Sequence, residues 1–273
     1  MTKEEYLKAK VKTGHQLVES NGVWWEAKAK GYCKTAIPYE LVPLEKAKPG
    51  MGLAWKGFNH RIENEKKASG FWKPFVMDGE QLSSWSLETL ESGNRRRRIK
   101  KGLAHNVVEK LNSLDGHQEA FSRILKSTAI RNGHGHPPEY YEVPNGPWWK
   151  TIERVFEYTE FWCAFQNGKM AGYICLHVMG DRVIVDGVKS DTDMLPDCPM
   201  DAIIYHFLVD LQKRGGINEI WYGGKSNRPT LDAFKESFGF KVKYIPFRTK
   251  FLGGLLTYPK WLNRYIKRGD DEQ

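Results

Sequence analysis

The chain has 273 residues, of which 40% are hydrophobic, and this content excludes a disordered protein and is enough to bury a sizeable core. Its 42 Lys and Arg residues outnumber 33 Asp and Glu residues, so the net charge of +9 favours anionic partners such as nucleotides, tRNA or phospholipid surfaces. No run approaches the roughly 18 apolar residues of a membrane span, and the N-terminus has no apolar secretion segment, so we expect a cytoplasmic protein without a transmembrane segment.

The first 80 residues predict a small α/β region. Residues 1–20 read as a short charged helix, and residues 23–29 and 32–42 read as two strands around a Lys-Gly turn. Residues 43–79 combine turn signals with five Trp and Phe side chains, which either fill a small core or line a groove.

Residues 82–103 predict one helix that carries a dense basic run. Six of the seven residues from Arg95 to Lys101 are Arg or Lys, and like charges this close repel one another unless an anion lies nearby. The run is either a phosphate or substrate contact, or a solvated face that binds nucleic acid without specificity. As substrate-binding candidates in this run we take Arg95, Arg96, Arg98 and Lys101.

A helix over residues 115–131 and a long loop over residues 132–149 follow. The loop contains His134, His136 and Tyr140 among several prolines and glycines, which is typical of a loop that shapes a substrate pocket. A His-x-His pair on an irregular loop without a third ligand is a weak metal signal. The four cysteines are scattered without CxxC spacing and read as buried thiols, so we expect no metal.

The chain then changes to a strand-rich pattern. Residues 161–166, 170–179 and 182–189 are separated by Asn-Gly and Gly-Asp turn dipeptides, and this predicts an antiparallel meander. A helix over residues 200–214, a strand over 219–222, a helix over 231–237 and a strand over 242–247 complete the order β-β-β-α-β-α-β. Residues 251–273 form a basic amphipathic tail that either packs on the protein or contacts a membrane surface or partner.

This order, together with three short motifs, resembles the GNAT acyltransferase fold and its FemAB-like branch. The motifs are FKESFGF at residues 234–240, the arginine-rich stretch at residues 95–103 and the stretch NGHGHPPEYY at residues 132–141. The resemblance implies an α+β fold with a mixed sheet: a smaller N-terminal α/β region at residues 1–104, which could be a reduced copy of the same fold, a catalytic domain at 105–250, and a tail at 251–273.

The resemblance also implies an N-acyltransferase in which an amine attacks the acyl donor directly, without a covalent enzyme intermediate. The donor would be acyl-CoA or aminoacyl-tRNA, and the acceptor an amine that can carry phosphate. The connection at residues 190–200 lacks the Arg-x-x-Gly-x-Gly signature of coenzyme A binding and carries Asp191, Asp193 and Asp197, which repel phosphate. The competing hypothesis is a binding module without catalysis that holds nucleic acid or an anionic surface through the basic helix.

Five residues are the catalytic candidates. The resemblance makes Lys235 the first candidate, because the lysine of the FKxxFG helix faces the active channel in FemAB-like enzymes. Without the resemblance, the simpler interpretation is an exposed helix lysine that pairs with Glu236 or Asp232. Asp186 is a carboxylate inside an apolar strand, which is costly to bury unless it is paired or used. The remaining three are His177, for proton transfer, and Tyr173 and Tyr222, whose hydroxyls could act as acid or oxyanion donor. Gly223 and Gly224 are substrate-binding candidates, because they permit close backbone approach to a ligand.

Overall fold

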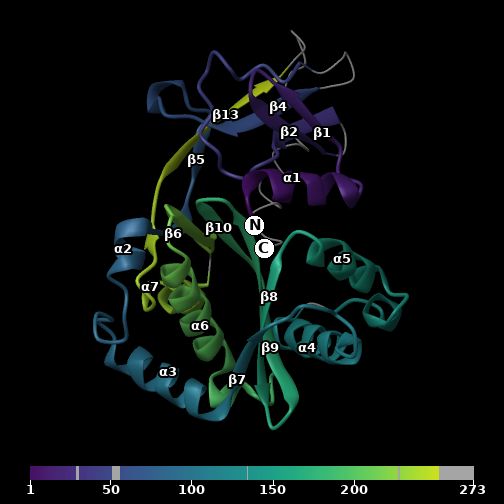
Figure 1. Cartoon of the computed structure of the whole chain (residues 1–273), viewed down its shortest axis with the longest axis vertical. Helices are drawn as coiled ribbons and strands as arrows, with labels where there is room; N and C mark the ends of the chain where they lie inside the picture. The colour runs from purple at the N-terminus through teal and green to yellow at the C-terminus, as the bar shows by residue number, and fades with distance from the viewer. Residues whose placement is uncertain (29–30, 51–55, 134, 227, 252–273) are drawn as a thin grey trace. The chain divides into compact units, whose positions relative to one another are not determined.

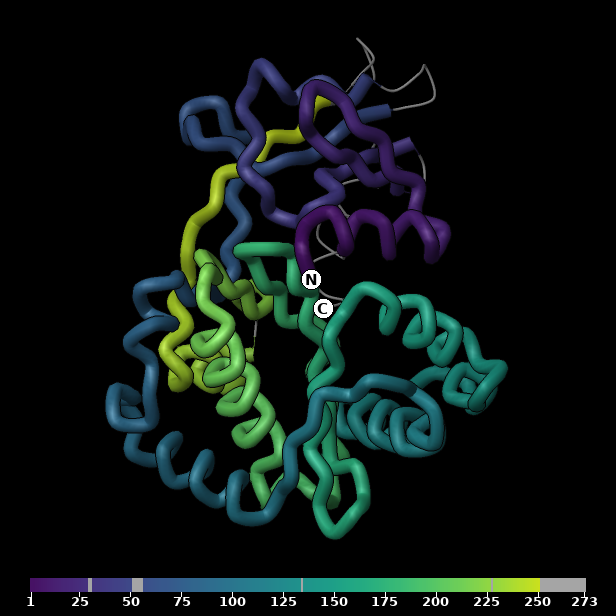
Figure 2. The backbone as a smooth tube through the Cα atoms, in the orientation of Figure 1, coloured from purple at the N-terminus to yellow at the C-terminus, as the bar shows by residue number. Residues whose placement is uncertain are grey.

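The structure is a computed structural model that describes residues 1–28, 31–50, 56–133, 135–226 and 228–251. The chain forms two compact units, drawn as a cartoon in Figure 1 and as a tube in Figure 2. The first contains Met1–Val76, Gly223–Ala233 and the chain from Lys241, and the second contains Met77–Tyr222 and Phe234–Phe240.

The first unit is built on helix α1 and a six-stranded sheet. α1 (Lys3–Lys12) begins with a capping box in which the Thr2 side chain and Glu5 satisfy each other's backbone amides. The buried side chains of Trp25, Cys33 and Phe58 belong to its core. The strand order is β1 (Leu17–Ser20), β2 (Val23–Lys28), β3 (Tyr32–Thr35), β4 (Gly57–Arg61), β13 (Ile245–Phe251) and β5 (Gly70–Trp72).

The second sheet is mixed and has seven strands. Its central meander is antiparallel, whereas β10 and β11 run parallel because helix α6 connects them. The order is β12 (Lys241–Val242), β6 (Pro74–Asp78), β11 (Glu219–Gly224), β10 (Arg182–Ser190), β9 (Lys169–Met179), β8 (Glu160–Gln166) and β7 (Val107–Lys110). The predicted α+β class with a mixed sheet is therefore confirmed, and so are the meander and the crossover.

Helices cover both faces of this sheet within the second unit. α6 (Pro199–Arg214) packs on β8 and β9, and α4 (Gln118–Arg131) packs on β9 and β10 from the opposite face (Figure 1). α3 (Gly93–His105) lies along α6, although about a hundred residues separate the two in the chain (Figure 2). The remaining helical segments are α2 (Gly79–Ser83), α5 (Pro147–Phe156), α7 (Pro229–Glu236), η2 (Glu65–Lys67), η3 (Pro138–Tyr141) and η4 (Leu195–Asp197).

Several predicted elements were wrong in their bounds. The single helix over residues 82–103 is two helices, because Ser92 caps α3 by accepting a hydrogen bond from the Arg95 amide. The loop over residues 132–149 ends inside α5, whose Trp148 and Trp149 are buried. The last strand is split into β12 and β13, and β13 pairs with β4 and β5 in the first sheet.

The predicted domain boundaries at residues 104 and 250 stay a prediction. The two compact units are defined by packing, and packing does not show which part of the chain carries a catalytic function. The basic tail at residues 252–273 lies outside the described residues.

The closest approach between α3 and α6 depends on a glycine. A Cβ on Gly102 would lie 2.6 Å from the Cys198 carbonyl oxygen and 3.1 Å from the Ala202 amide nitrogen. We expect Gly102→Ala to lower the free energy of unfolding by about 1–3 kcal/mol through overpacking, although alanine favours a helix interior by about 1 kcal/mol. Urea unfolding followed by tryptophan fluorescence measures this change.

Gly93 at the start of the same helix is the matched control. Its Cβ would meet only the flexible Arg96 guanidinium, at 3.5 Å. Gly93→Ala should leave stability unchanged or raise it slightly. Equal stability of the two variants would contradict the close approach of α3 and α6.

Candidate active site

Strand β10 leaves its neighbour β11 about a third of the way along its length. The parallel pairing covers only Arg182–Ile184 of β10, and β10 continues to Ser190. At the same place the register with β9 shifts between Asp186 and Lys189, which marks a β-bulge. Gly187 has a φ of +58° there, and a Cβ on it would lie 3.0 Å from Cys175 Sγ. Beyond Ile184, β10 thus no longer pairs with β11, and its backbone is irregular at Gly187.

The predicted pair His177 and Asp186 meets next to this bulge. They lie on neighbouring strands, with His177 Nε2 3.4 Å from Asp186 Oδ2, and the Gly187 amide donates a hydrogen bond of 2.8 Å to Asp186 Oδ1. The hydrogen bond from His177 holds the pKa of Asp186 below its usual value and outweighs burial, which acts in the opposite direction. The Asp186 side chain is 59% exposed, so solvent reaches the carboxylate, and its role as a base stays a prediction.

Tyr173 lies deeper on the same strand as His177. Its ring packs 4.7 Å from Phe121 of α4 and 6.2 Å from Phe161 of β8, measured between ring centroids. Burial raises the pKa of its hydroxyl well above the usual value. Tyr173 is thus a core residue, and a catalytic role for it stays a prediction.

Lys235 is buried, with 5% of its surface exposed, so it is not the exposed helix lysine of the simpler interpretation. Its Nζ lies 5.5 Å from the ring centroid of Tyr222, which is typical of a cation–π contact. The Tyr222 hydroxyl is buried and has no hydrogen-bond partner among the residues described, and burial raises its pKa. The structure therefore brings two predicted catalytic residues together in one buried place.

Arg95 holds the segment that carries Lys235. Its Nε donates a hydrogen bond of 2.8 Å to Ser237 Oγ, and its guanidinium carbon lies 4.5 Å and 4.7 Å from the ring centroids of Phe234 and Phe238. Its Nη1 forms an ion pair with the buried carboxylate of Asp201 on α6. A substrate anion would have to replace these partners.

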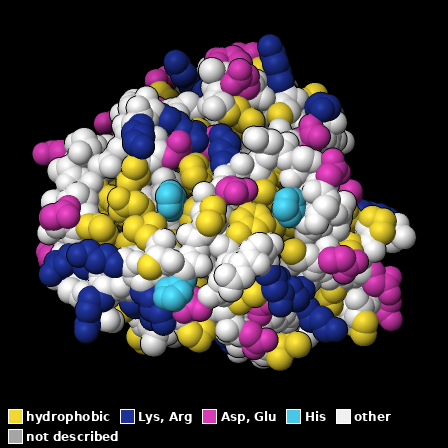
Figure 3. Space-filling model, turned by 60° about the horizontal axis from the view of Figure 1, so that its bottom comes forward, with side chains coloured by type: hydrophobic (Ala, Val, Ile, Leu, Met, Phe, Trp, Pro, Cys, Tyr) yellow, Lys and Arg dark blue, Asp and Glu magenta, His cyan; other side chains and the backbone are white. Residues whose placement is uncertain are grey.

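The other basic residues of α3 are closer to solvent. Arg96 donates a hydrogen bond to the Leu90 carbonyl oxygen. Arg98 lies 3.3 Å from Asp201, and Lys101 lies 3.4 Å from Asp197, with 43% and 47% of their side chains exposed. On the face drawn in Figure 3, Lys and Arg side chains form separate groups with hydrophobic and histidine side chains between them. Arg98 and Lys101 can therefore reach a ligand more readily than Arg95 can.

The loop that the sequence predicts to shape a substrate pocket is held by aromatic contacts. The rings of His136 and Tyr140 stack at 4.1 Å, and the His136 amide donates a hydrogen bond of 3.1 Å to the Tyr141 hydroxyl. Burial and the neighbouring Tyr141 raise the pKa of Tyr140. His134 lies outside the described residues.

The two predicted glycines follow Tyr222 at the end of β11. Gly223 has a φ of +59°, a conformation that favours glycine, and a Cβ on Gly224 would meet open space. Their role in ligand approach stays a prediction.

The N-terminus of α6 does not fit the pyrophosphate of coenzyme A. Its first residue is Pro199, which has no amide hydrogen to donate, and the buried Asp201 carboxylate occupies the first turn. Gly102 of α3 packs against this turn, and the Asn106 side chain donates a hydrogen bond of 2.8 Å to the Asp197 carbonyl oxygen. The place where a GNAT fold is expected to hold its donor's phosphates is thus filled by the chain itself.

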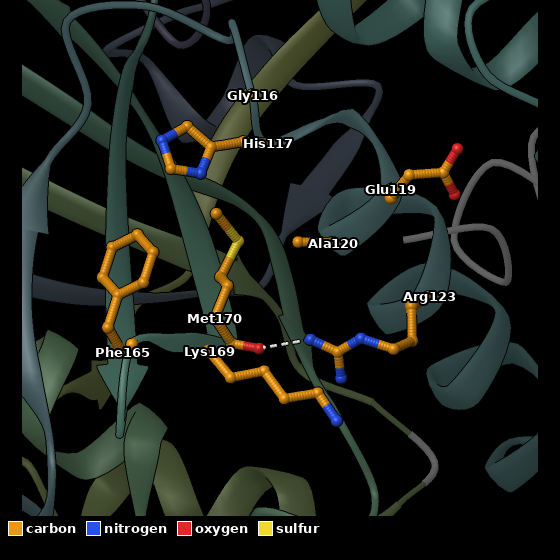
Figure 4. Close-up of a pocket in the computed structure, with 9 residues that line it drawn as sticks. Gly116, His117, Glu119, Ala120, Arg123, Phe165, Lys169 and Met170 are labelled. Atoms are coloured by element: carbon orange, nitrogen blue, oxygen red, sulfur yellow. Dashed lines mark hydrogen bonds between the residues drawn. The ribbon is translucent and has the colours of Figure 1, made fainter.

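A pocket of about 480 Å³ that the sequence reasoning missed lies at the start of α4 (Figure 4). His117, Arg123, Phe165 and Lys169 belong to its lining, and Arg123 donates a hydrogen bond of 2.6 Å to the Met170 carbonyl oxygen. Arg123 also pairs with Asp191, so part of the positive charge is neutralised.

Two general properties concern metals and membranes. Within the described ranges, no group of three or more His, Cys, Asp and Glu side chains is placed to hold a metal ion. In that same part of the chain, no helix is both long and apolar enough to cross a membrane.

Comparisons with known proteins agree with the fold. No family model and no curated protein sequence matches this chain. Among solved structures, FemX matches with a TM-score of 0.63 and 11% identity over 96% of this chain and 93% of its own. L-PGS from Bacillus licheniformis matches with a TM-score of 0.62 and 12% identity over 97% of this chain and 95% of its own.

A third match is the C-terminal domain of a protein from Agrobacterium fabrum assigned as a lysylphosphatidylglycerol synthetase. It has a TM-score of 0.60 and 10% identity over 97% of this chain and 91% of its own. The chain thus has the fold of FemX and L-PGS, the GNAT-like fold that the sequence motifs indicated. The likeness extends over nearly the whole chain and is one of fold.

The buried hydroxyl of Tyr222 makes a testable difference to stability. A buried hydroxyl without a partner costs about 1–3 kcal/mol, so we expect Tyr222→Phe to raise the free energy of unfolding by about 1 kcal/mol, as measured by urea denaturation. Tyr141→Phe is the matched control, because the Tyr141 hydroxyl accepts a hydrogen bond and its loss should destabilise. Destabilisation by Tyr222→Phe would show that the hydroxyl has a partner.

Proposed function

We propose that this chain is a transferase that moves an aminoacyl group from an aminoacyl-tRNA to an amine acceptor. The observation that carries the proposal is the His177 and Asp186 pair at the point where β10 leaves β11, because an acceptor amine must lose a proton before it attacks. The fold shared with FemX and L-PGS supports the same class, and the name lysylphosphatidylglycerol describes a lipid that carries an aminoacyl group.

Asp186 would act as the base in this reaction. The ammonium of the acceptor gives a proton to Asp186, and His177 stabilises the carboxylate before the transfer. The free amine then attacks the carbonyl carbon of the donor ester, so that a carbon–nitrogen bond forms and the carbon–oxygen bond to the ribose breaks. The attacking nitrogen loses its surplus proton to the ribose oxygen, which leaves as a hydroxyl, and no covalent enzyme intermediate is required.

Lys235 and Tyr222 would act on the negative charge that develops during this attack. A cation held in a buried place stabilises an oxyanion more strongly than the same cation in water does. The Tyr222 hydroxyl has no partner among the described residues, so its hydrogen is available for the same oxygen. Arg95 would keep the segment that carries Lys235 in place.

The choice of aminoacyl-tRNA as the donor rests on the net charge of the chain and on the space at the N-terminus of α6. The filled N-terminus of α6 disfavours coenzyme A at its expected position, whereas an aminoacyl-tRNA is held through many phosphates spread over a basic surface. The net charge of +9 is compatible with such a donor. Acyl-CoA is the competing donor and belongs in the same assay.

The test is transfer of a radiolabelled aminoacyl group from a mixture of charged tRNAs to soluble amines and to phospholipid vesicles, beside acetyl-coenzyme A as donor. We expect product from the charged tRNAs, and we expect Lys235→Met to lower the rate by roughly 10²- to 10³-fold, as loss of an oxyanion donor does. Lys241→Met, at an exposed lysine of β12, is the control and should keep the full rate.

Transfer from acetyl-coenzyme A alone would contradict the donor, and an unchanged rate in Lys235→Met would contradict the role of that lysine. Absence of any transfer, together with tRNA affinity that falls when Arg97 and Lys100 become glutamine, would favour the binding module.

The His177 and Asp186 pair predicts a shift in the pH profile. His177 lowers the pKa of Asp186, so His177→Leu should raise that pKa and move the acid limb of kcat/KM to higher pH. His105→Leu, at an exposed histidine of α3, should leave the limb in place. A limb that does not move in His177→Leu would exclude Asp186 as the base that the profile reports.

A further inference from the structure

The β-bulge in β10 turns a lysine onto the face of the sheet that carries Asp186. In the antiparallel pairing, Asp186 is the partner of Cys175 of β9 and Lys189 is the partner of Tyr173. The distance from Asp186 to Lys189 is three residues along β10, whereas the distance between their partners is two residues along β9. In a regular strand residues three apart point to opposite faces, but the extra residue at the bulge brings Asp186 and Lys189 to the same one. His177 belongs to this face as well, because it lies two residues from Cys175.

Lys189 is a cation without a close partner. It is half-buried, and it makes no hydrogen bond or ion pair with any residue that the structure describes. Burial lowers its pKa, and the nearby Asp186 opposes this effect only in part. A lysine in this position is costly to keep charged unless an anion binds it.

Asp186 does not neutralise Lys189 by direct contact. Its two carboxylate oxygens are engaged by His177 and by the Gly187 amide. The residues opposite Asp186 and Lys189 are two positions apart on β9, which corresponds to about 7 Å along a strand. The backbone positions that carry this carboxylate and this ammonium group thus lie on one face of the sheet, about 7 Å apart, a spacing that a small molecule can span.

We infer that Lys189 recognises an anionic group on the acceptor, a carboxylate or a phosphate, while Asp186 receives the acceptor's amine. The acceptor class is therefore an amine whose anionic group lies a few bonds away. This inference rests on the proposed function, since it concerns the acceptor of the same reaction. A simple amine would engage Asp186 alone and bind more weakly.

Calorimetric titration of the full chain tests this inference without any donor. The probes are O-phosphoethanolamine, β-alanine and ethanolamine, which share the amine and differ in the anionic group. We expect one of the two anionic probes to bind at least tenfold more tightly than ethanolamine, and the better of them identifies phosphate or carboxylate as the preferred group.

The decisive variant is Lys189→Met, which keeps most of the length of the unbranched side chain and removes its charge. It should lose the preference for the anionic probe by at least tenfold and leave ethanolamine binding unchanged, whereas Lys189→Arg should retain part of the preference. Lys126→Met, at an exposed lysine of α4, is the control and should bind as the original chain does. Far-ultraviolet circular dichroism and urea unfolding establish that each variant is folded.

Three results would overturn the inference: equal affinity for all three probes, no binding of any of them, or an unchanged preference in Lys189→Met. Failure of the proposed function is a separate result, because it shows as absent transfer in the assay with charged tRNA while the titration still follows the expected pattern. Transfer that proceeds with an unchanged acceptor preference in Lys189→Met would remove the inference and leave the function in place.

Discussion

The second unit depends on the buried ion pair between Arg95 and Asp201. Asp201 is almost fully buried in the first turn of α6, and Arg95 reaches it from α3. Removing one partner of a buried pair costs about 3–5 kcal/mol, because the other charge is left uncompensated. The same guanidinium bonds Ser237 and packs on Phe234 and Phe238, so a single side chain ties two helices to the segment that carries Lys235.

The bulge in β10 is a second constraint, of backbone rather than charge. Gly187 permits it because a residue with a side chain is strained at a φ of +58° and would press on Cys175. One extra residue changes which side chains share a face, and it does so where β11 has already left the strand. In a regular β10, the side chains of Lys189 and Asp186 would point to opposite faces of the sheet.

Local sequence predicted the elements whose signals are themselves local. The Asn167-Gly168 turn fixed the first hairpin of the meander, since both residues have positive φ. The bounds of β13 were beyond such reasoning, because its pairing with β4 joins positions nearly two hundred residues apart. The bounds of α5 were missed because prolines and glycines in the preceding loop hid a helix that itself begins with Pro147.

Some residues of the candidate site could likewise be predicted from the sequence, and others could not. Lys235 was singled out by the resemblance, and Asp186 by the free-energy cost of burying a carboxylate in an apolar strand. Four consecutive arginines, by contrast, do not reveal from the sequence which one points into the protein. Helix geometry places Arg95 against Asp201 and leaves Arg97 exposed. Lys189 escaped notice because its face depends on the bulge, although a glycine within a strand is a signal for one.

The filled N-terminus of α6 bears on how a donor can be held. A helix N-terminus attracts an anion through its free amides, and here Asp201 is that anion while Pro199 removes one of the amides. Arg98 and Lys101, the cations nearest this place, already pair with the carboxylates of Asp201 and Asp197. Among the described basic residues of α3, those on its exposed side, such as Arg97 and Lys100, are therefore the ones best placed to contact a donor. An exposed basic surface suits a large polyanion, which spreads its phosphate contacts over many residues. It suits a coenzyme less well, because a coenzyme needs one enclosed phosphate site.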